Sequence, residues 1–288
     1  MNWQESGEDL KIEIEAFDST MASGKKKTLK GSEAFHAHYG AIYRERWEVL
    51  KGAMGSPREA EAVKEGLLRP YHLDGGSLWP PSLLMVKAGE AVLDLCSAPG
   101  GKALQLALAL GGNGRLVLNE LSRSRRNRLE RVVEEHLEPS LRKNIEIWGK
   151  DGSRLGEYIE DRFDAILLDA PCSSERHLIE NPSQLETWGP KRTKQLAHRQ
   201  MGLLCSALEL LKPGGRLVYS TCSISPEENE NLIEKFIKKR KGRVESVDQP
   251  GGPGEKKSYG RLILPDTSFG QGPMFACLMM AVEKEETI

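Results

Sequence analysis

The chain has few cysteines and no long apolar run, and both shortages exclude whole classes of protein. It holds only five cysteines in 288 residues, an odd and widely spaced set without a CxxC pair. This argues against a disulfide framework and a structural zinc site, so we expect no metal and a reducing compartment. No apolar stretch approaches the roughly 20 residues that a membrane span needs. The segment Met1–Asp18 is acidic and lacks an apolar core, so neither a signal peptide nor an Arg-rich transit peptide is predicted.

An excess of charge of either sign is also missing. With 41 Lys and Arg against 42 Asp and Glu, the formal net charge is −1, so the protein is not a polycation. Its basic residues are nevertheless clustered, which leaves room for a local phosphate-binding face even though solvated helix faces explain any one cluster. The four clusters are Lys25-Lys26-Lys27, Arg123–Arg131, Lys191–Lys194 and Lys238–Arg243.

The chain divides into three parts by composition. Residues 1–32 carry a Ser/Gly/Lys-rich stretch and are predicted to be a flexible N-terminal segment. Residues 33–80 are predicted to be a helical N-terminal extension, with helices at Ala34–Met54 and Pro57–Leu67 and a break at Pro80-Pro81. From Glu90 onward apolar runs alternate with amphipathic stretches, which is the βαβ rhythm of a parallel sheet. Residues 81–288 are therefore predicted to be one α/β domain.

The periodicity places seven strands and four helices in this domain. We expect strands at Ala91–Cys96, Arg115–Asn119, Ile145–Trp148, Phe163–Asp169, Arg216–Ser220, Arg243–Val247 and Met274–Val282. We expect helices at Lys102–Leu110, Ser122–Leu137, Lys191–Leu211 and Pro226–Lys239. Pro226 followed by two glutamates is a good helix start, and Lys212–Gly215 is expected to form the turn after the long helix.

Polar residues follow three successive strands in the order expected of a nucleotide cradle. A glycine turn at Pro99-Gly100-Gly101 opens a helix, where backbone and N–H groups approach a ligand closely. Glu120 follows the second strand, where an acid binds a ribose diol, and Asp151-Gly152 follows the third, suited to an adenine edge. The turn lacks GxGxxG spacing and a Walker motif, so NAD and ATP are poorer candidates than another adenosine ligand.

Two cysteine motifs end two further strands about fifty residues apart. Asp169-Ala170-Pro171-Cys172 follows one buried strand, and Ser220-Thr221-Cys222-Ser223 ends another. The carboxyl ends of parallel strands meet at one edge of the sheet, where such folds hold ligands. Two thiols beside an acid at that edge indicate covalent chemistry, and we assign no chemistry to the thiols of Cys96, Cys205 and Cys277.

Together with Cys96-Ser97-Ala98-Pro99-Gly100-Gly101-Lys102, these motifs closely resemble the Sun/Fmu-type RNA cytosine-5 methyltransferases. The resemblance runs from about Tyr71 onward and is specific, because three separate motifs occur in the family's order and spacing. It implies a class I S-adenosylmethionine-dependent methyltransferase fold, which is Rossmann-like with a seven-stranded, mostly parallel sheet whose last strand is antiparallel. It also implies S-adenosyl-L-methionine as cofactor and RNA, ribosomal or transfer, as partner.

The resemblance also implies roles for individual positions. Cys222 matches the nucleophile, Cys172 the residue that assists release, and Asp169 the acid of the catalytic pocket, with Lys102 in reach of that acid or of the cofactor. The positions that match cofactor contacts are Cys96, Ser97, Ala98, Pro99, Gly100, Gly101, Lys102, Glu120, Arg125, Asp151, Gly152 and Asp169.

Carbon 5 of cytosine is a poor nucleophile, which explains the need for a thiolate. Addition of sulfur to carbon 6 makes carbon 5 enamine-like, so that it can attack a sulfonium methyl group. A free thiol is only a few per cent ionised near pH 7, and we expect the helix beginning near Pro226 to favour the Cys222 thiolate. Asp169, protonated or sharing a proton, is expected to donate to N3 of the base.

One departure from the family concerns the residues after the Pro-Cys motif. Many members continue with Ser-Gly-x-Gly, whereas this chain reads Ser173-Ser174-Glu175-Arg176-His177-Leu178. With Gly270–Phe275, this looks more like the short mitochondrial-type branch, which acts on ribosomal or transfer RNA. Accessory RNA recognition then has to come from Ala34–Leu67, the basic clusters or a partner protein, and we expect a monomer.

Two other functions stay open at this point. DNA cytosine-5 methyltransferases attack with the Pro-Cys cysteine, here Cys172, but their Glu-Asn-Val motif is absent and Cys222 would be unexplained. A non-catalytic RNA or ribosome assembly factor is the second alternative, and the intact acid and cysteines argue against it. We expect a cytoplasmic protein, or a mitochondrial one if a presequence was removed. The target nucleotide is not indicated by the sequence.

Overall fold

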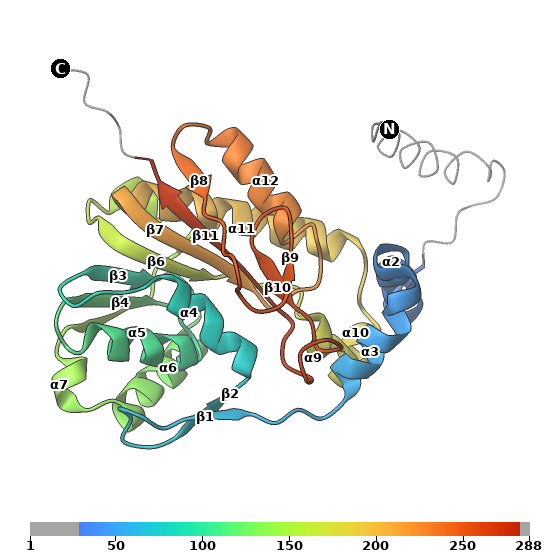
Figure 1. The fold of residues 1–288 in the computed structure, drawn as a ribbon, viewed down its shortest axis with the longest axis horizontal. Helices are drawn as coiled ribbons and strands as arrows, with labels where there is room; N and C mark the ends of the chain where they lie inside the picture. Colours follow the sequence, from blue (N-terminus) through green and yellow to red (C-terminus); the bar gives the residue numbers. More distant parts are fainter. Residues whose placement is uncertain (1–28, 283–288) are drawn as a thin grey trace.

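A computed structural model describes residues 29–282 of the chain, and a twisted sheet forms its centre (Figure 1). Eight strands follow one another across the sheet, and β8 (Val244–Ser246) pairs with one end of β11. The order is β5 (Ile145–Trp148), β4 (Arg115–Asn119), β3 (Ala91–Asp94), β6 (Phe163–Asp169), β7 (Leu211–Thr221), β11 (Met274–Ala281), β10 (Arg261–Ile263) and β9 (Glu255–Lys256).

All seven predicted strands are present, and the last one is antiparallel as expected. Strands β5, β4, β3, β6 and β7 are parallel neighbours, whereas β11 runs antiparallel to β7 over Phe275–Met280. The short strands β10 and β9 are additions that the sequence did not indicate, and they widen the sheet beyond β11. The α/β methyltransferase-like fold is therefore confirmed, with two more strands than expected.

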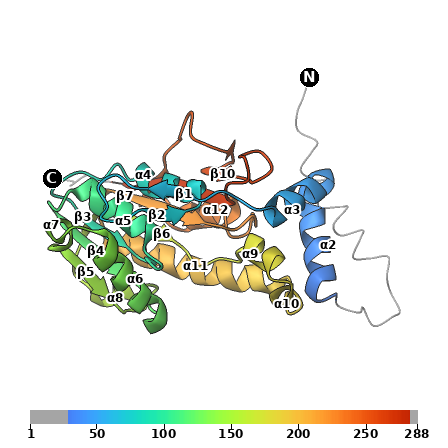
Figure 2. The same cartoon turned by 90° about the horizontal axis from the view of Figure 1, so that it is seen from below.

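Helices cover both faces of the sheet (Figure 2). Alternate residues of β3 pack to opposite sides, Val92 in one apolar cluster and Leu93 in the other. The cluster around Val92 includes α5 (Gly101–Leu110), α6 (Arg123–His136) and the segment after α4 (Trp79–Leu83). The cluster around Leu93 includes α11 (Lys191–Leu210) and α12 (Glu230–Lys239). The remaining short helices are α7 (Pro139–Arg142), α8 (Leu155–Tyr158), α9 (Glu175–Glu180) and α10 (Pro182–Leu185).

The predicted first helix is present but divided. Helix α2 (Gly31–Tyr43) ends at Arg44, whose φ of +52° breaks the helical path, and α3 (Trp47–Gly55) follows a single 3-10 turn. Phe35, Tyr39 and Trp47 are buried; Phe35 and Tyr39 pack on Trp188, and Trp47 stacks on Tyr39, which fixes this extension beside α10. The predicted flexible segment lies outside the described residues, apart from its end, which enters α2.

The predicted second helix, Pro57–Leu67, is wrong. Residues 57–60 form no regular element, and β1 (Glu61–Val63) pairs with β2 (Tyr71–Leu73) as an antiparallel hairpin. Gly66 has a φ of +75°, which turns the chain back between the two strands and is incompatible with a helix. Local helical spacing was therefore overridden by hairpin pairing.

A further expectation about a chain break is also wrong. Pro80 and Pro81 lie in the first turn of α4, where their missing N–H groups cost nothing, so they begin a helix rather than interrupt the chain. Residues 212–215, the expected turn after the long helix, lie within β7, which starts at Leu211 directly after α11, but they bulge out of its pairing with β6, which resumes at Arg216. Among the described residues, no helix is long and apolar enough to cross a membrane.

Candidate functional site

The site lies at the carboxyl ends of β3, β4, β6 and β7. Because these strands are parallel neighbours, their last residues come together although they are distant in the sequence. Asp94 ends β3, Asn119 ends β4, Asp169 ends β6 and Thr221 ends β7. The residues that the sequence singled out after these strands therefore share one edge of the sheet.

The glycine turn adopts the conformation that its residues predict. Gly100 has a φ of +121° and serves as the N-cap of α5, and a Cβ added there would lie 2.8 Å from Val132 Cγ1. Only glycine fits this backbone and this close helix packing. Lys102, the second residue of α5, points at the end of β6, where its Nζ lies 2.7 Å from Oδ2 of Asp169.

A cavity in front of this turn contains an unpaired acid that the sequence reasoning missed. Asp94 is only 1% exposed, and neither of its carboxylate oxygens has a hydrogen-bond partner within the described part of the chain. Burial, and then the charge of Asp169, raise the pKa of Asp94 to about 7. An orphaned carboxyl group in a cavity suits a cationic ligand group. The cavity is lined by Tyr71, Leu73, Ser77, Asp94, Cys96, Ser97, Ala98, Pro99, Gly101, Lys102 and Asp169.

A second hollow continues from Cys96 towards β4 and β5. Here Glu120 is 5% exposed and pairs with Arg125 at 3.1 Å, and Arg125 also donates to the carbonyl of Ala98 at 2.6 Å. The hydrogen bond from Ser153 holds the pKa of Asp151 below its usual value. The hollow is lined by Leu95, Cys96, Asn119, Glu120, Leu121, Arg125, Asp151, Gly152, Pro171, Arg199 and Leu203. Arg199, from α11, carried no sequence signal and completes this hollow from the opposite side.

Asp169 accepts two hydrogen bonds from side chains. Besides Lys102, the hydroxyl of Ser220 donates to Oδ1 at 2.8 Å. Burial opposes the charge on Lys102, but the Asp169 carboxylate raises the pKa of this ammonium above its ordinary value. Lys102 is therefore a proton-bearing group beside Asp169, the residue that the sequence had led us to expect as the donor to the base.

The two cysteines of the motifs are in direct contact. Cys172 Sγ lies 3.1 Å from Cys222 Sγ, and Ser174 Oγ lies 3.2 Å from the same Cys222 sulfur. The hydrogen bond from Cys172 lowers the pKa of Cys222, burial opposes this, and the bond from Ser174 adds to the lowering. The same contact, followed by burial, raises the pKa of Cys172 well above its usual value. Cys222 is therefore the better thiolate of the two.

The predicted helix dipole does not account for this thiolate. Pro226 lies in a turn, and α12 begins only at Glu230, so the predicted start of this helix is wrong. The effect of a helix end falls off within its first turn, and Cys222 lies eight residues before α12. Hydrogen bonds from Cys172 and Ser174 replace it as the stabilising contacts.

Behind the two cysteine loops lies a buried pair of carboxyl groups. Glu228 and Glu175 are both fully buried, and Oγ of Ser223 lies between them, 3.2 Å from Glu228 Oε1 and 3.0 Å from Glu175 Oε1, so that its one proton is shared between the two carboxyl groups. Tyr39 of α2 donates to Glu175 at 2.5 Å, and both the amide and the hydroxyl of Ser173 donate to Glu228. Burial, and then the charge of Glu175, raise the pKa of Glu228 to about 7. This network fixes the residues next to both cysteines.

A third cavity, of about 260 Å³, opens in front of Cys222. It is lined by Arg58, Asp74, Ser77, Ser174, Arg176, His177, Glu180, Cys222, Gly272, Pro273 and Met274. Cys222 borders this cavity and Cys172 does not, while Ser77 borders both this cavity and the one that contains Asp94. The thiolate thus faces a space of nucleoside size that adjoins the ligand cradle.

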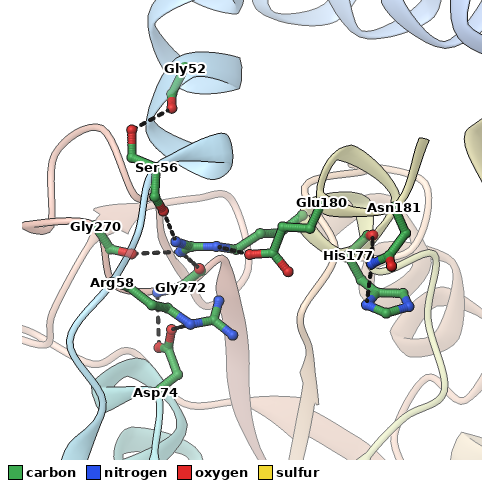
Figure 3. Close-up of polar contacts among 10 residues, drawn as sticks. Gly52, Ser56, Arg58, Asp74, His177, Glu180, Asn181, Gly270 and Gly272 are labelled. Carbon is green, nitrogen blue, oxygen red and sulfur yellow. Dashed lines mark hydrogen bonds and ion pairs between the residues drawn. The ribbon is translucent and has the colours of Figure 1, made fainter.

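Arg176 binds three carbonyls around this cavity, and the residues that provide them, Ser56, Gly270 and Gly272, are labelled in Figure 3. Its guanidinium donates to the carbonyls of Gly270, Gly272 and Ser56 at 2.6, 2.7 and 3.0 Å. Only 5% of its side chain is exposed, so these bonds form in a largely dry environment. Sequence reasoning missed Arg176 and Arg58, because the residues that they meet are far away in the chain.

The comparisons with known proteins agree with this geometry. The family model described as 16S rRNA methyltransferase RsmB/F matches residues 81–279. The chain belongs to the RsmB/F methyltransferase family. The resemblance seen in the three sequence motifs is thereby confirmed.

Named relatives fall in the same group and are longer than this chain. It is 36% identical over 223 residues to the mitochondrial tRNA (cytosine(34)-C(5))-methyltransferase of Danio rerio, covering 73% of this chain and 60% of that protein. It is 35% identical over 236 residues to the 5-cytosine rRNA methyltransferase NSUN4 of Bos taurus, covering 74% and 60%. The chain therefore spans about 60% of the length of these curated relatives.

A solved structure shares the arrangement of elements. NSun6 from Pyrococcus horikoshii, determined with the ligand SFG, superposes with a TM-score of 0.65 at 26% identity. The match covers 75% of this chain and 54% of that one. The class I methyltransferase fold predicted from the sequence is confirmed.

Proposed function

We propose that this protein transfers a methyl group from S-adenosyl-L-methionine to carbon 5 of a cytosine in RNA. One observation carries the proposal: Cys222, whose pKa is lowered by neighbouring hydrogen bonds, borders a cavity of nucleoside size beside the ligand cradle. The family and the names of the relatives support the reaction type. The methyltransferase domain that we propose is residues 81–288.

The residues of the cradle fit this cofactor. The unpaired carboxyl group of Asp94 suits the ammonium of its methionine part, and Gly100 lets the backbone approach closely. Glu120 suits the ribose diol, and Asp151 with Gly152 suits the adenine edge, as proposed from the sequence. When bound, S-adenosylmethionine supplies an electrophilic methyl group.

The protein groups act at two places on the base, Cys222 at carbon 6 and the pair of Lys102 and Asp169 at the polar edge of the ring. The Cys222 thiolate forms a bond to carbon 6, and the electron pair displaced from the 5,6 double bond makes carbon 5 the methyl acceptor. Lys102 and Asp169 lie as an ion pair at the ring's polar edge, where Lys102 can hold a proton as charge develops. After methyl transfer, the carbon-5 proton leaves to water, and the electrons of its C–H bond re-form the 5,6 double bond. The carbon–sulfur bond breaks in the same step with its electron pair on the Cys222 sulfur, and the S–H of Cys172 stabilises this departing thiolate by a hydrogen bond.

The same contacts speak against the DNA alternative. A DNA-type enzyme would attack with Cys172, but the pKa of Cys172 is raised and this residue does not border the cavity. A non-catalytic assembly factor would have no need for a thiol pair tuned in this way. RNA is therefore the substrate that we propose, as ribosomal or transfer RNA. A monomer, recognition through a partner protein and a cytoplasmic location stay predictions.

Trapping with 5-fluorocytosine tests the proposal. Fluorine at carbon 5 cannot leave as a proton does, so RNA carrying this base should form a covalent complex with the wild-type protein in the presence of cofactor. Cys222→Ser should abolish both the complex and methyl transfer, whereas Cys172→Ser should retain the complex. DNA of the same sequence serves as the substrate control.

Three outcomes would contradict the proposal in different ways. Trapping by Cys222→Ser equal to wild type would overturn the assignment of the nucleophile. Preferential trapping of DNA through Cys172 would restore the DNA alternative. Binding of S-adenosylmethionine with no methyl transfer to any cellular RNA would leave the assembly factor as the better explanation.

A further inference from the structure

Phe269 is the most exposed large apolar side chain of the described residues. Its relative exposure is 104%, and its φ is +51°, a left-handed conformation that is unfavourable for a bulky residue. The turn around it is held by backbone bonds, from Gly270 N to Pro265 O at 3.0 Å and from Thr267 N to Leu264 O at 3.1 Å. Neither packing nor local preference explains an aromatic ring here, and the ring is fully available for a contact with another molecule.

Arg58 offers unused hydrogen-bond donors at the cavity in front of Cys222. Within the described residues, its one carboxylate neighbour is Asp74, at 3.5 Å from Nε, and 38% of its side chain is exposed. The other oxygen of Asp74 is already bound by the amides of Gly76 and Gly272, both at 2.9 Å. In Figure 3 the forked end of the guanidinium points away from Asp74, to the side of Glu180 and His177, which also line this cavity.

Arg176, which lines this cavity, connects the segments that carry these two residues. Its guanidinium binds the carbonyl of Ser56, two residues before Arg58, and that of Gly270, the residue after Phe269. In Figure 3 the hydrogen bonds of one guanidinium end on Ser56 and Gly270, which come from two separate segments. Arg58 therefore lies on the wall of the cavity that contains Cys222, and Phe269 lies next to a residue that a lining side chain binds.

We infer that the rim of the cavity in front of Cys222 binds the RNA strand on either side of the target cytosine. Phe269 stacks on a neighbouring base, and Arg58 contacts a phosphate. The inference rests on the proposed function. A base that enters the cavity has to leave its stack, which uncovers a face of the adjacent base. An aromatic side chain can cover that face whatever the base, and a guanidinium binds phosphate through two parallel N–H groups.

Two RNA probes separate the two contacts. The first is a dye-labelled single strand of about twelve nucleotides with one central cytosine, and the second carries abasic nucleotides on both sides of that cytosine. Dissociation constants are measured by fluorescence anisotropy at several KCl concentrations. Phe269→Ala should weaken the first probe at least about fivefold and leave the second unchanged, because stacking needs a base. Its salt slope should stay as in wild type, and Phe269→Trp should restore affinity.

Arg58→Gln should give the opposite signature. It should weaken both probes alike and reduce the slope of log affinity against log salt by about one, because one phosphate contact is lost. Met85→Ala is the matched control for Phe269→Ala, since Met85 is also exposed, at 62%, with a φ of +47°, but it is not next to a residue that Arg176 binds. Binding of S-adenosylmethionine by every variant serves as the measure of folding.

Wild-type affinity of Phe269→Ala for both probes would overturn the stacking contact, and an unchanged salt slope in Arg58→Gln would overturn the phosphate contact. Wild-type protein that binds neither probe would overturn the whole inference. Failure of the proposed function is a separate result. It would show as these binding differences in full, with no methyl transfer by the wild-type protein.

Discussion

The sulfur atoms of Cys172 and Cys222 lie 3.1 Å apart, although the residues are fifty positions apart in the chain. The contact shifts the two pKa values in opposite directions: the pKa of Cys222 is lowered and that of Cys172 is raised. One thiol therefore donates its proton towards the other sulfur, which becomes the nucleophile. Adjacent parallel strands β6 and β7 produce this pairing, because each motif directly follows one of them.

Removal of the Cys172 thiol should make Cys222 harder to ionise. In Cys172→Ala the first of the contacts that lower the pKa of Cys222 is lost, so this pKa should rise and less thiolate should be present near pH 7.5. The rate of alkylation of Cys222 by iodoacetamide, followed by mass spectrometry across pH 6 to 10, measures this shift. Cys205→Ala is the control and should leave the profile unchanged. A profile in Cys172→Ala identical to wild type would contradict the assigned hydrogen bond.

The ion pair between Lys102 and Asp169 should matter far more for activity than a similar pair at the other end of β6. Lys102→Met removes the proton-bearing partner of Asp169, and we expect methyl transfer to fall by about 10²-fold or more. Lys212→Met breaks the pair with Asp164, at 2.8 Å on the same strand, and should leave the rate within about twofold. Single-turnover methylation of RNA measures both. Equal losses in the two variants would show that the effect is on folding.

Glu228 should make the protein less stable as the pH rises. Its pKa is raised from 4.5 to about 7, so the folded state holds the proton more tightly than the unfolded state. This contribution to stability is complete below pH 4.5 and is lost as the pH rises through 7, by up to roughly 3 kcal/mol. In Glu228→Gln the side chain stays neutral, so the fall in stability between pH 5 and pH 8 should be smaller than in wild type.

Urea unfolding at a series of pH values tests this expectation, and only the slopes against pH are compared. Glu234→Gln is the control, because Glu234 lies on the surface beside Lys238 and should keep the wild-type slope. Stability of wild type that is constant or rising between pH 5 and pH 8 would be evidence that Glu228 is ionised throughout.

The sequence predicted those parts of the site that depend on neighbouring residues in the chain. The glycine turn, Glu120 and Asp151 each follow a strand with a clear apolar pattern, and parallel pairing then places them at one edge. The motif residues Cys172, Cys222 and Asp169 were placed correctly for the same reason. Asp94 could have been suspected, since it is a carboxylate inside an otherwise apolar strand end.

Other parts of the site depend on contacts that no local pattern reveals. Tyr39 meets Glu175 across 136 positions, and Arg176 meets Ser56 across 120. The predicted helix at Pro57–Leu67 failed because hairpin pairing with β2 outweighed local spacing. The helix predicted from Pro226 starts later because Ser225 and Pro226 accept backbone bonds from Glu228 and Asn229 in separate turns.

The hydrogen bonds of the Arg176 guanidinium also affect the order in which the ligand cradle and the cavity before Cys222 unfold. Most of the ligand cradle follows the ends of regular strands, whereas Arg176 holds the cavity before Cys222 through carbonyls of Ser56, Gly270 and Gly272, which lie outside helices and strands. Irregular surface segments are among the first to open when a protein is destabilised. Mild heating or low urea should therefore erase the RNA site while the cofactor site survives. A partly unfolded molecule would still bind the methyl donor but would no longer bind RNA.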